Sequence, residues 1–236
     1  MSNAVLCFPV VPGKTEQDIR RIADRFKDDP EGYRQSRAKG GVSLERAFWQ
    51  HTPMGDFVVA YVESDMEITD GLAAIASDTS EMGRFFVENV KEVHGVDIAQ
   101  ASAGPAPEIV GQWVDPQATG RGKGMAFSAP LIPDQLEQGR RFAHEAFETR
   151  KDEFTQSRRA LGGTREVVCI NHSPHGPICC VYIEGENPTE INRRFAASQE
   201  PFDVWFKDQC KIIFPPYVDF NEPVPGITEI FDSVDA

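Results

Sequence analysis

The sequence repeats itself, and this repeat limits the possible folds more than any other feature. Residues 35–63 align without a gap with residues 156–184, at a constant offset of 121 positions, and ten of the 29 aligned pairs are identical. Composition alone would give about two identities in such a window. The period is too long for a solenoid, so two small domains of one design are predicted. The identical residues of the first copy are Gln35, Ser36, Arg37, Gly41, Glu45, His51, Pro53, Gly55, Tyr61 and Glu63.

Each copy begins with the same predicted elements. An apolar strand opens the copy, at 4–11 and at 125–132, and a helix with apolar residues at helical spacing follows. Pro30 is expected to interrupt this helix in the first copy, whereas the helix of the second copy is expected to run unbroken to Ala160. A pair of glycines ends the helix in both copies, which is typical of a C-terminal cap.

A β-hairpin, a second helix and a final strand complete each copy. The second helices are predicted at 67–92 and 188–212, and the final strands are "HGVDIA" and "PPYVDF". The order strand, helix, strand, strand, helix, strand is that of a ferredoxin-like βαββαβ unit. We therefore predict an α+β protein with ferredoxin-like repeats at 1–99 and 125–236, joined by a Gly- and Pro-rich linker at 100–124.

Two such units in tandem resemble the dimeric α+β barrel superfamily, which includes antibiotic-biosynthesis monooxygenase-like, stress-responsive barrel and chlorite dismutase-like proteins. The resemblance covers nearly the whole chain and rests on element order, duplication and the hairpin pattern, without a diagnostic fingerprint of residues. It implies that the two antiparallel sheets pack into one intramolecular α+β barrel, because helices cover only one face of each sheet. It also implies an apolar pocket between sheet and helices.

Charge and cysteine usage disfavour several classes of function. The 236-residue chain has 37 acidic and 24 basic residues, a net charge of −13, which disfavours binding to nucleic acid or to an anionic membrane surface. No apolar run is long enough to span a bilayer, and the N-terminus lacks the pattern of a signal peptide. Five scattered cysteines without a CxxC spacing argue against a zinc site or a disulfide framework. We expect a cytoplasmic protein.

The strand after each hairpin turn supplies the first candidate site residues. One face of the strand is expected to carry Phe57, Val59, Tyr61 and Glu63, and the other, which is expected to lie under the helices, carries Val58, Ala60 and Val62. Tyr61 and its counterpart Tyr182 are therefore predicted as catalytic groups for a phenolic or enolic substrate. Phe57, Glu63 and Glu184 are predicted to bind that substrate. The alternative is that both tyrosines are core residues with satisfied hydroxyl groups.

The repeated histidines His51 and His172 are further candidates for catalysis, because the pKa of imidazole lies near working pH. Their direction depends on the hairpin register. A four-residue loop would align His51 with Val58, toward the helices, and a three-residue loop would align it with Phe57, toward the barrel interior. The sequence does not choose between these registers. The alternative is that each histidine fixes its turn by bonding to the backbone.

The second copy differs from the first at His175, which replaces Met54 and creates the sequence "HSPH". Two histidines alone make an incomplete metal site, so no metal is predicted, and His175 is assigned to substrate binding. This difference favours the second repeat as the active half. Arg37 and Arg158 are expected to cap a helix or to pair with the glutamates eight residues later, and His94 and His144 occur in one copy only.

Two classes of function remain open from the sequence. The first is a cofactor-independent enzyme of the oxygenase, isomerase or cyclase type, acting on a small aromatic or polyketide-like compound in an apolar pocket. The second is a non-catalytic ligand-binding or structural barrel, and haem binding is a third option. The expected partner is a small-molecule ligand, and the expected state is a monomer with an intramolecular barrel or a homodimer.

Overall fold

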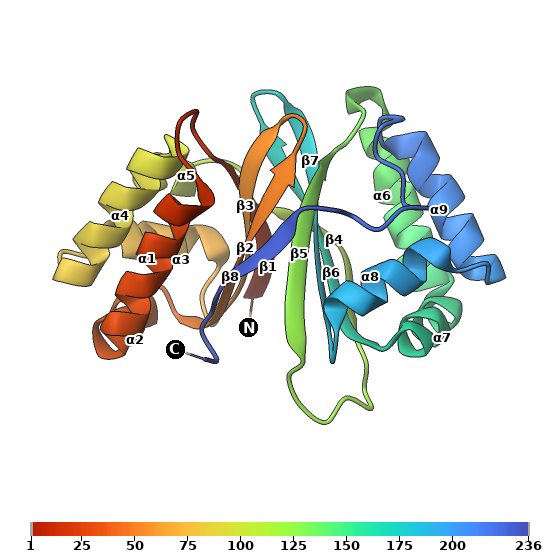
Figure 1. Ribbon diagram of the computed structural model, residues 1–236, viewed down its shortest axis with the longest axis horizontal. Helices are drawn as coiled ribbons and strands as arrows, with labels where there is room; N and C mark the ends of the chain where they lie inside the picture. The colour runs from red at the N-terminus through yellow and green to blue at the C-terminus, as the bar shows by residue number, and fades with distance from the viewer. Residues whose placement is uncertain (1, 236) are drawn as a thin grey trace. The chain divides into compact units, whose positions relative to one another are not determined.

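A computed structural model describes residues 2–235 of the chain, which form two compact units. Unit 1 comprises Met1–Ala106 and Gly226–Ala236, and unit 2 comprises Pro107–Pro225. Each unit has one four-stranded antiparallel sheet, and its helices gather on one face of that sheet (Figure 1). The predicted α+β class with two ferredoxin-like repeats is confirmed. The packing of the two sheets into a barrel stays a prediction.

The two sheets have equivalent strand orders. The order in unit 1 is β1-β3-β2-β8, and the order in unit 2 is β4-β6-β7-β5. The strands of unit 1 are β1 (Ser2–Pro9), β2 (Val42–Thr52), β3 (Gly55–Ser64) and β8 (Ile227–Asp232). Those of unit 2 are β4 (Glu108–Val114), β5 (Lys123–Pro130), β6 (Gly163–Ser173) and β7 (Gly176–Gly185). Both ends of β5, β6 and β7 lie 121 residues after the ends of β1, β2 and β3, as the sequence offset predicts.

The fourth strand of each sheet differs from the prediction. β8, near the end of the chain, pairs with β2 of the first repeat, and β4, which follows the first repeat, pairs with β6. The segment 100–124 therefore contains a strand and is more than a linker. The predicted final strands are absent: 94–99 leads into a short helix that Asp97 caps, and 215–220 begins with two prolines, which cannot donate ladder hydrogen bonds.

The helices follow in chain order. Unit 1 contains α1 (Glu16–Asp28), α2 (Pro30–Lys39), α3 (Ile68–Ala76), α4 (Glu81–His94) and α5 (Ile98–Ser102). Unit 2 contains α6 (Leu136–His144), α7 (Lys151–Leu161), α8 (Pro188–Ala197) and α9 (Pro201–Ile213). A 3-10 turn (Pro133–Gln135) precedes α6, and a π-helical turn (Glu145–Thr149) follows it.

Local sequence explains where the first helix of each repeat is interrupted. Pro30 starts α2 because proline suits the first turn, and the side chain of Asp29 accepts a hydrogen bond from Gly32 N at 3.0 Å. The second repeat lacks this proline, but its helix is not regular to Ala160, since the π-helical turn separates α6 from α7. Gly162, with φ of 94°, ends α7 in the left-handed region, as predicted.

Each unit buries an apolar core between its helices and the facing side of its sheet. In unit 1, Trp49 and Val58 of the hairpin pack with Phe26, Met82 and Phe231. The rings of Phe26 and Phe231 meet edge to face, with centroids 5.4 Å apart. Strand β8 thus contributes core side chains as well as hydrogen bonds, and unit 1 is incomplete without residues from the far end of the chain.

The substitution Phe231→Ala should destabilise unit 1 selectively. Removing this buried ring leaves a void beside Phe26 and Tyr33, and such a change costs about 3–5 kcal/mol of unfolding free energy. Hydrogen exchange read by mass spectrometry should show faster exchange in β2 and β3 and little change in β6 and β7. Val234→Ala, at an exposed position, is the control. Equal effects of the two variants would contradict a structural role for β8.

Candidate functional site

A cavity with a volume of about 120 Å³ lies in unit 1 between the sheet and the helices. Most of its lining is apolar and comes from β1, β3, β8 and the surrounding helices. The polar exceptions are Arg37, Glu45, Ser64 and His94. An engineered apolar cavity of about 150 Å³ binds benzene, so this cavity suits a ligand of about one aromatic ring.

Arg37 and Glu45 form a buried ion pair in the cavity wall. Arg37 Nε lies 2.6 Å from Glu45 Oε2, and Tyr33 donates its hydroxyl hydrogen to the same oxygen at 3.0 Å. Tyr33 and Arg37 are four residues apart on α2, so both side chains reach Glu45 from one helix face. A paired charge can stay buried in an apolar wall, whereas loss of one partner would leave the other uncompensated.

One nitrogen of the Arg37 guanidinium group makes no hydrogen bond to the described part of the protein. Arg37 is 2% exposed, and its Nη1 has no hydrogen-bond partner within residues 2–235. Its Cζ lies 3.9 Å from the centroid of the Phe86 ring, which gives the cation a favourable aromatic face. Burial lowers the pKa of Arg37, but Glu45 and Tyr33 outweigh burial and raise it, so the group stays cationic. A buried donor of this kind can bind an acceptor oxygen of a ligand.

His94, the last residue of α4, also lines the unit 1 cavity and is 7% exposed. Its Nδ1 lies 2.8 Å from the carbonyl oxygen of Pro9, so Nδ1 must carry the hydrogen, because a carbonyl only accepts. The ring makes no second hydrogen bond within the described residues. Burial lowers the pKa of His94, and the hydrogen bond to Pro9 only partly opposes this shift. The ring is therefore neutral at neutral pH, and its Nε2 can accept a proton.

Unit 2 contains a corresponding cavity of about 100 Å³. A buried ion pair lines it too: Arg158 Nε lies 2.7 Å from Glu166 Oε2. The position that corresponds to His94 is Pro215, so this cavity has no histidine in its lining. Its thiols are poor nucleophiles, since burial raises the pKa of Cys179 to about 12 and raises that of Cys210 well above its ordinary value.

The arginine of unit 2 has partners that its counterpart in unit 1 lacks. Arg158 Nη1 donates to Ser157 Oγ at 3.1 Å, and this hydroxyl group donates to Asp203 Oδ1 at 2.5 Å. Asp203 occupies the position of Met82 in unit 1, and Phe154 occupies that of Tyr33. The two cavities thus share an ion pair but differ in the hydrogen-bonding capacity left for a ligand.

The predicted tyrosine and glutamate site lies on the other face of each sheet. Tyr61 donates its hydroxyl hydrogen to Glu63 Oε1 at 2.5 Å, and Tyr182 donates to Glu184 Oε2 at 2.8 Å. All four residues are buried, and none of them lines either cavity, because strand alternation directs them away from the helices. Phe57 shares that face and is half-buried. The catalytic and binding roles assigned to these residues stay predictions.

The hairpin register differs from both alternatives considered from the sequence. Thr52 pairs with Gly55 and His51 pairs with Asp56, so the loop is only Pro53 and Met54. Gly55 has φ of 125°, which a glycine tolerates, and Thr52 Oγ1 closes the turn by donating to Gly55 O at 2.7 Å and accepting from Met54 N at 3.2 Å. The threonine, and not the histidine, is thus the residue that bonds to the turn backbone. Ser173 makes the equivalent bonds in unit 2.

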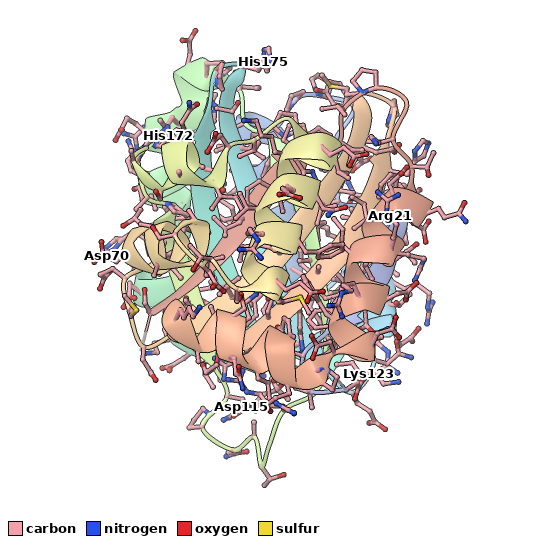
Figure 2. The ribbon with its side chains drawn as sticks, turned by 90° about the vertical axis from the view of Figure 1, so that its left-hand side faces the viewer. Arg21, Asp70, Asp115, Lys123, His172 and His175 are labelled. Atoms are coloured by element: carbon pink, nitrogen blue, oxygen red, sulfur yellow. The ribbon has the colours of Figure 1, made fainter. Side chains whose placement is uncertain are left out.

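The hairpin histidines lie near the turns and outside the cavities. The side chain of His51 is 73% exposed and contacts Asp56, with Nδ1 2.5 Å from Oδ1. His172 and His175 are exposed near the end of the β6–β7 hairpin, where Figure 2 labels them. None of the three lines either of the two cavities described above. The cavity that holds a histidine belongs to unit 1, whereas the sequence favoured the second repeat.

His94 is the functional candidate that the sequence analysis passed over. Most predicted site residues are shared by the two copies, and His94 occurs in one copy only. The signal that could have found it is the same kind of mismatch that drew attention to His175: a histidine at one position of the repeat and a proline at the other. Its burial, however, depends on contact with β1, which no local pattern specifies.

The described part of the chain offers no alternative metal centre, since no group of three or more His, Cys, Asp or Glu side chains is placed to hold a metal ion there. Within residues 2–235, no helix has both the length and the apolar character that a membrane span requires.

Comparisons with known proteins find similar solved structures, all at low sequence identity. No protein-family model matches the sequence, and no curated protein matches it significantly. An anthrone oxidase-like protein has a similar structure, with a TM-score of 0.48 and 8% identity over 96% of this chain and 88% of its own. A provisionally named monooxygenase from Lactobacillus acidophilus has a TM-score of 0.49 and 12% identity over 99% and 95%. One from Fusobacterium nucleatum has a TM-score of 0.45 and 10% identity over 96% and 88%.

The lowered pKa of His94 predicts a pH effect on stability. Between the folded pKa and the ordinary value of about 6.5, the unfolded chain binds a proton that the folded chain does not, so stability falls as the pH falls through that range. His94→Gln keeps a donor for Pro9 O but does not titrate, and its unfolding free energy should fall less between pH 7 and pH 5. His144→Gln, at an exposed position of α6, should keep the wild-type slope. Equal slopes for His94→Gln and wild type would contradict this assignment.

Proposed function

We propose that the protein is a cofactor-independent enzyme that takes a proton from a small cyclic carbonyl or phenolic compound in the cavity of unit 1. The observation that carries this proposal is the neutral His94 in an apolar cavity, with Nδ1 bonded to Pro9 O and Nε2 available. A neutral imidazole shielded from water is a competent general base. The chain is then a tandem-repeat relative of the α+β barrel proteins, with the small-molecule chemistry in its first repeat.

The polar groups of the unit 1 cavity suit the two requirements of such a reaction, which are a base for the proton and a cation for the negative charge that forms. His94 Nε2 would accept the proton from the carbon next to a carbonyl, and the electron pair of that C–H bond would move toward the carbonyl oxygen. The buried cation Arg37, whose Nη1 lacks a protein acceptor, would stabilise the negative oxygen that forms. Glu45 would keep Arg37 in place through the ion pair.

This first step is common to the isomerase and oxygenase types of reaction. Return of the proton to a different carbon gives an isomer, with no other reactant. Reaction of the carbanion with dioxygen converts a CH₂ group to a carbonyl group and releases one water, and the substrate supplies all the electrons. The resting cavity of about 120 Å³ favours a compound of about one ring over a fused polyketide.

The test uses 3-cyclohexenone in D₂O, with NMR to follow both deuterium uptake and conversion to 2-cyclohexenone, and an oxygen electrode to detect dioxygen consumption. Wild-type protein should accelerate deuterium uptake. His94→Gln should lose about 100-fold or more of this rate, and Arg37→Lys should lose a comparable factor, because each removes one group of the proposed step. His144→Gln, on the surface of unit 2, should retain the wild-type rate.

Two results would contradict the proposal. If His51→Gln or His172→Gln abolishes turnover and His94→Gln does not, the reactive group lies on a hairpin. If the ketone shifts the NMR signals of Ile19 and Ile75, which line the unit 1 cavity, without any exchange or conversion, the unit binds a ligand without catalysis.

A further inference from the structure

The cavity of unit 2 is close in volume to its counterpart, at about 100 against about 120 Å³, but every nitrogen of its arginine has a protein partner. Its polar lining consists of Arg158, Glu166, Asn192 and two thiols. Arg158 donates through Nε and Nη2 to the two carboxylate oxygens of Glu166, at 2.7 and 3.3 Å, and through Nη1 to Ser157. The ion pair is therefore satisfied inside the wall, and no counterpart of the unpartnered Arg37 nitrogen remains.

Asn192 is engaged in the same way. Its Nδ2 donates to Val224 O at 3.1 Å, and its Oδ1 accepts from Val224 N at 3.2 Å. These two bonds use the side-chain amide to fix the segment that leads out of unit 2. The corresponding position in unit 1 is Gly71, which has no side chain. Both polar atoms of the Asn192 side chain are thus bonded within the wall of the cavity and do not face a ligand as free groups.

The remaining lining is apolar and densely aromatic. Phe142 and Phe206 meet edge to face, with ring centroids 4.7 Å apart, and Phe214 and Phe220 follow at 5.2 Å. Cys179 and Cys210 stay uncharged, so they behave as small apolar side chains here. A cavity with such a lining stays dry, because a water molecule needs two to four polar partners.

We infer that the cavity of unit 2 is a separate binding site for an uncharged, apolar molecule of about one aromatic ring that has no hydrogen-bonding group. A hydroxyl or carbonyl group would lose its bonds to water and meet only polar groups that already have protein partners, which costs free energy. The two cavities of this duplicated chain therefore select different ligand classes: a compound with a polar reactive group in unit 1 and a plain hydrocarbon-like group in unit 2.

Benzene is the direct probe, with phenol as the matched polar compound. In methyl-resolved NMR titrations, benzene should shift the signals of Ile191 and Ile213, which line the unit 2 cavity. Phenol should bind there at least tenfold more weakly. Ala143→Leu fills the cavity from α6 and should abolish the benzene response, and Cys210→Leu fills it from α9 and provides a second variant.

Ala23→Leu is the matched control, because it fills the unit 1 cavity instead and should leave the benzene response of Ile191 intact. Three results would overturn the inference: no benzene response at Ile191 and Ile213, a response that survives both filling variants, or phenol binding there as tightly as benzene. The inference stands independently of the proposed catalysis. A protein with the benzene response but without ketone turnover keeps the inference and loses only the proposed function.

Discussion

The tight turns of the β2–β3 and β6–β7 hairpins set the register on which the rest of each unit depends. Because side chains alternate along a strand, a shift of one residue would exchange the face that lies under the helices with the opposite face. Thr52 and Gly55 allow a loop of two residues, and the resulting register turns Val58 toward the helices and Tyr61 away from them. The same register in unit 2, closed by Ser173 and Gly176, explains why both units form a cavity at the same place.

Duplication preserved this framework while single substitutions changed the chemistry inside it. The ion pair of Arg37 and Glu45 recurs as that of Arg158 and Glu166, with nearly the same distance between the charged atoms. Around it, Met82 corresponds to Asp203 and His94 to Pro215. In unit 2, Asp203 gives Arg158 an additional polar neighbour. Pro215 replaces the histidine, so no histidine is among the lining residues of that cavity. Two copies of one fold therefore have cavities at corresponding places with linings of different polarity.

The sequence predicted the three strands that each repeat supplies to its own sheet, because these strands carry the duplicated motif and clear apolar runs. It also predicted the aliphatic face of β3 that packs under the helices. It did not single out His94, which lines the cavity of the proposed site. The histidines that are shared by the copies are exposed strand residues beside the turns, and the buried histidine is held by the Pro9 carbonyl, a contact 85 residues away along the chain. Residues that both copies share are those that the fold requires. A residue that serves a site in only one copy appears as a difference between the copies.

The fourth strand of each sheet could not be predicted from the local sequence, for a different reason. "EIVGQWV" in β4 and "ITEIFD" in β8 are short, and each stands beside Pro and Gly residues that suggest a linker or a tail. β8 pairs with β2 of the first repeat, and β4 lies outside both predicted repeats, so the sequence of one repeat contains no information about either pairing. The chain must consequently pass out of unit 1 before Pro107 and return at Gly226 to complete it. A division of the chain before Pro107 would leave the sheet of unit 1 without β8 and the core of unit 1 without Ile230 and Phe231. The two units are thus similar in design, but unit 2 is one continuous segment of the chain, whereas unit 1 is built from two.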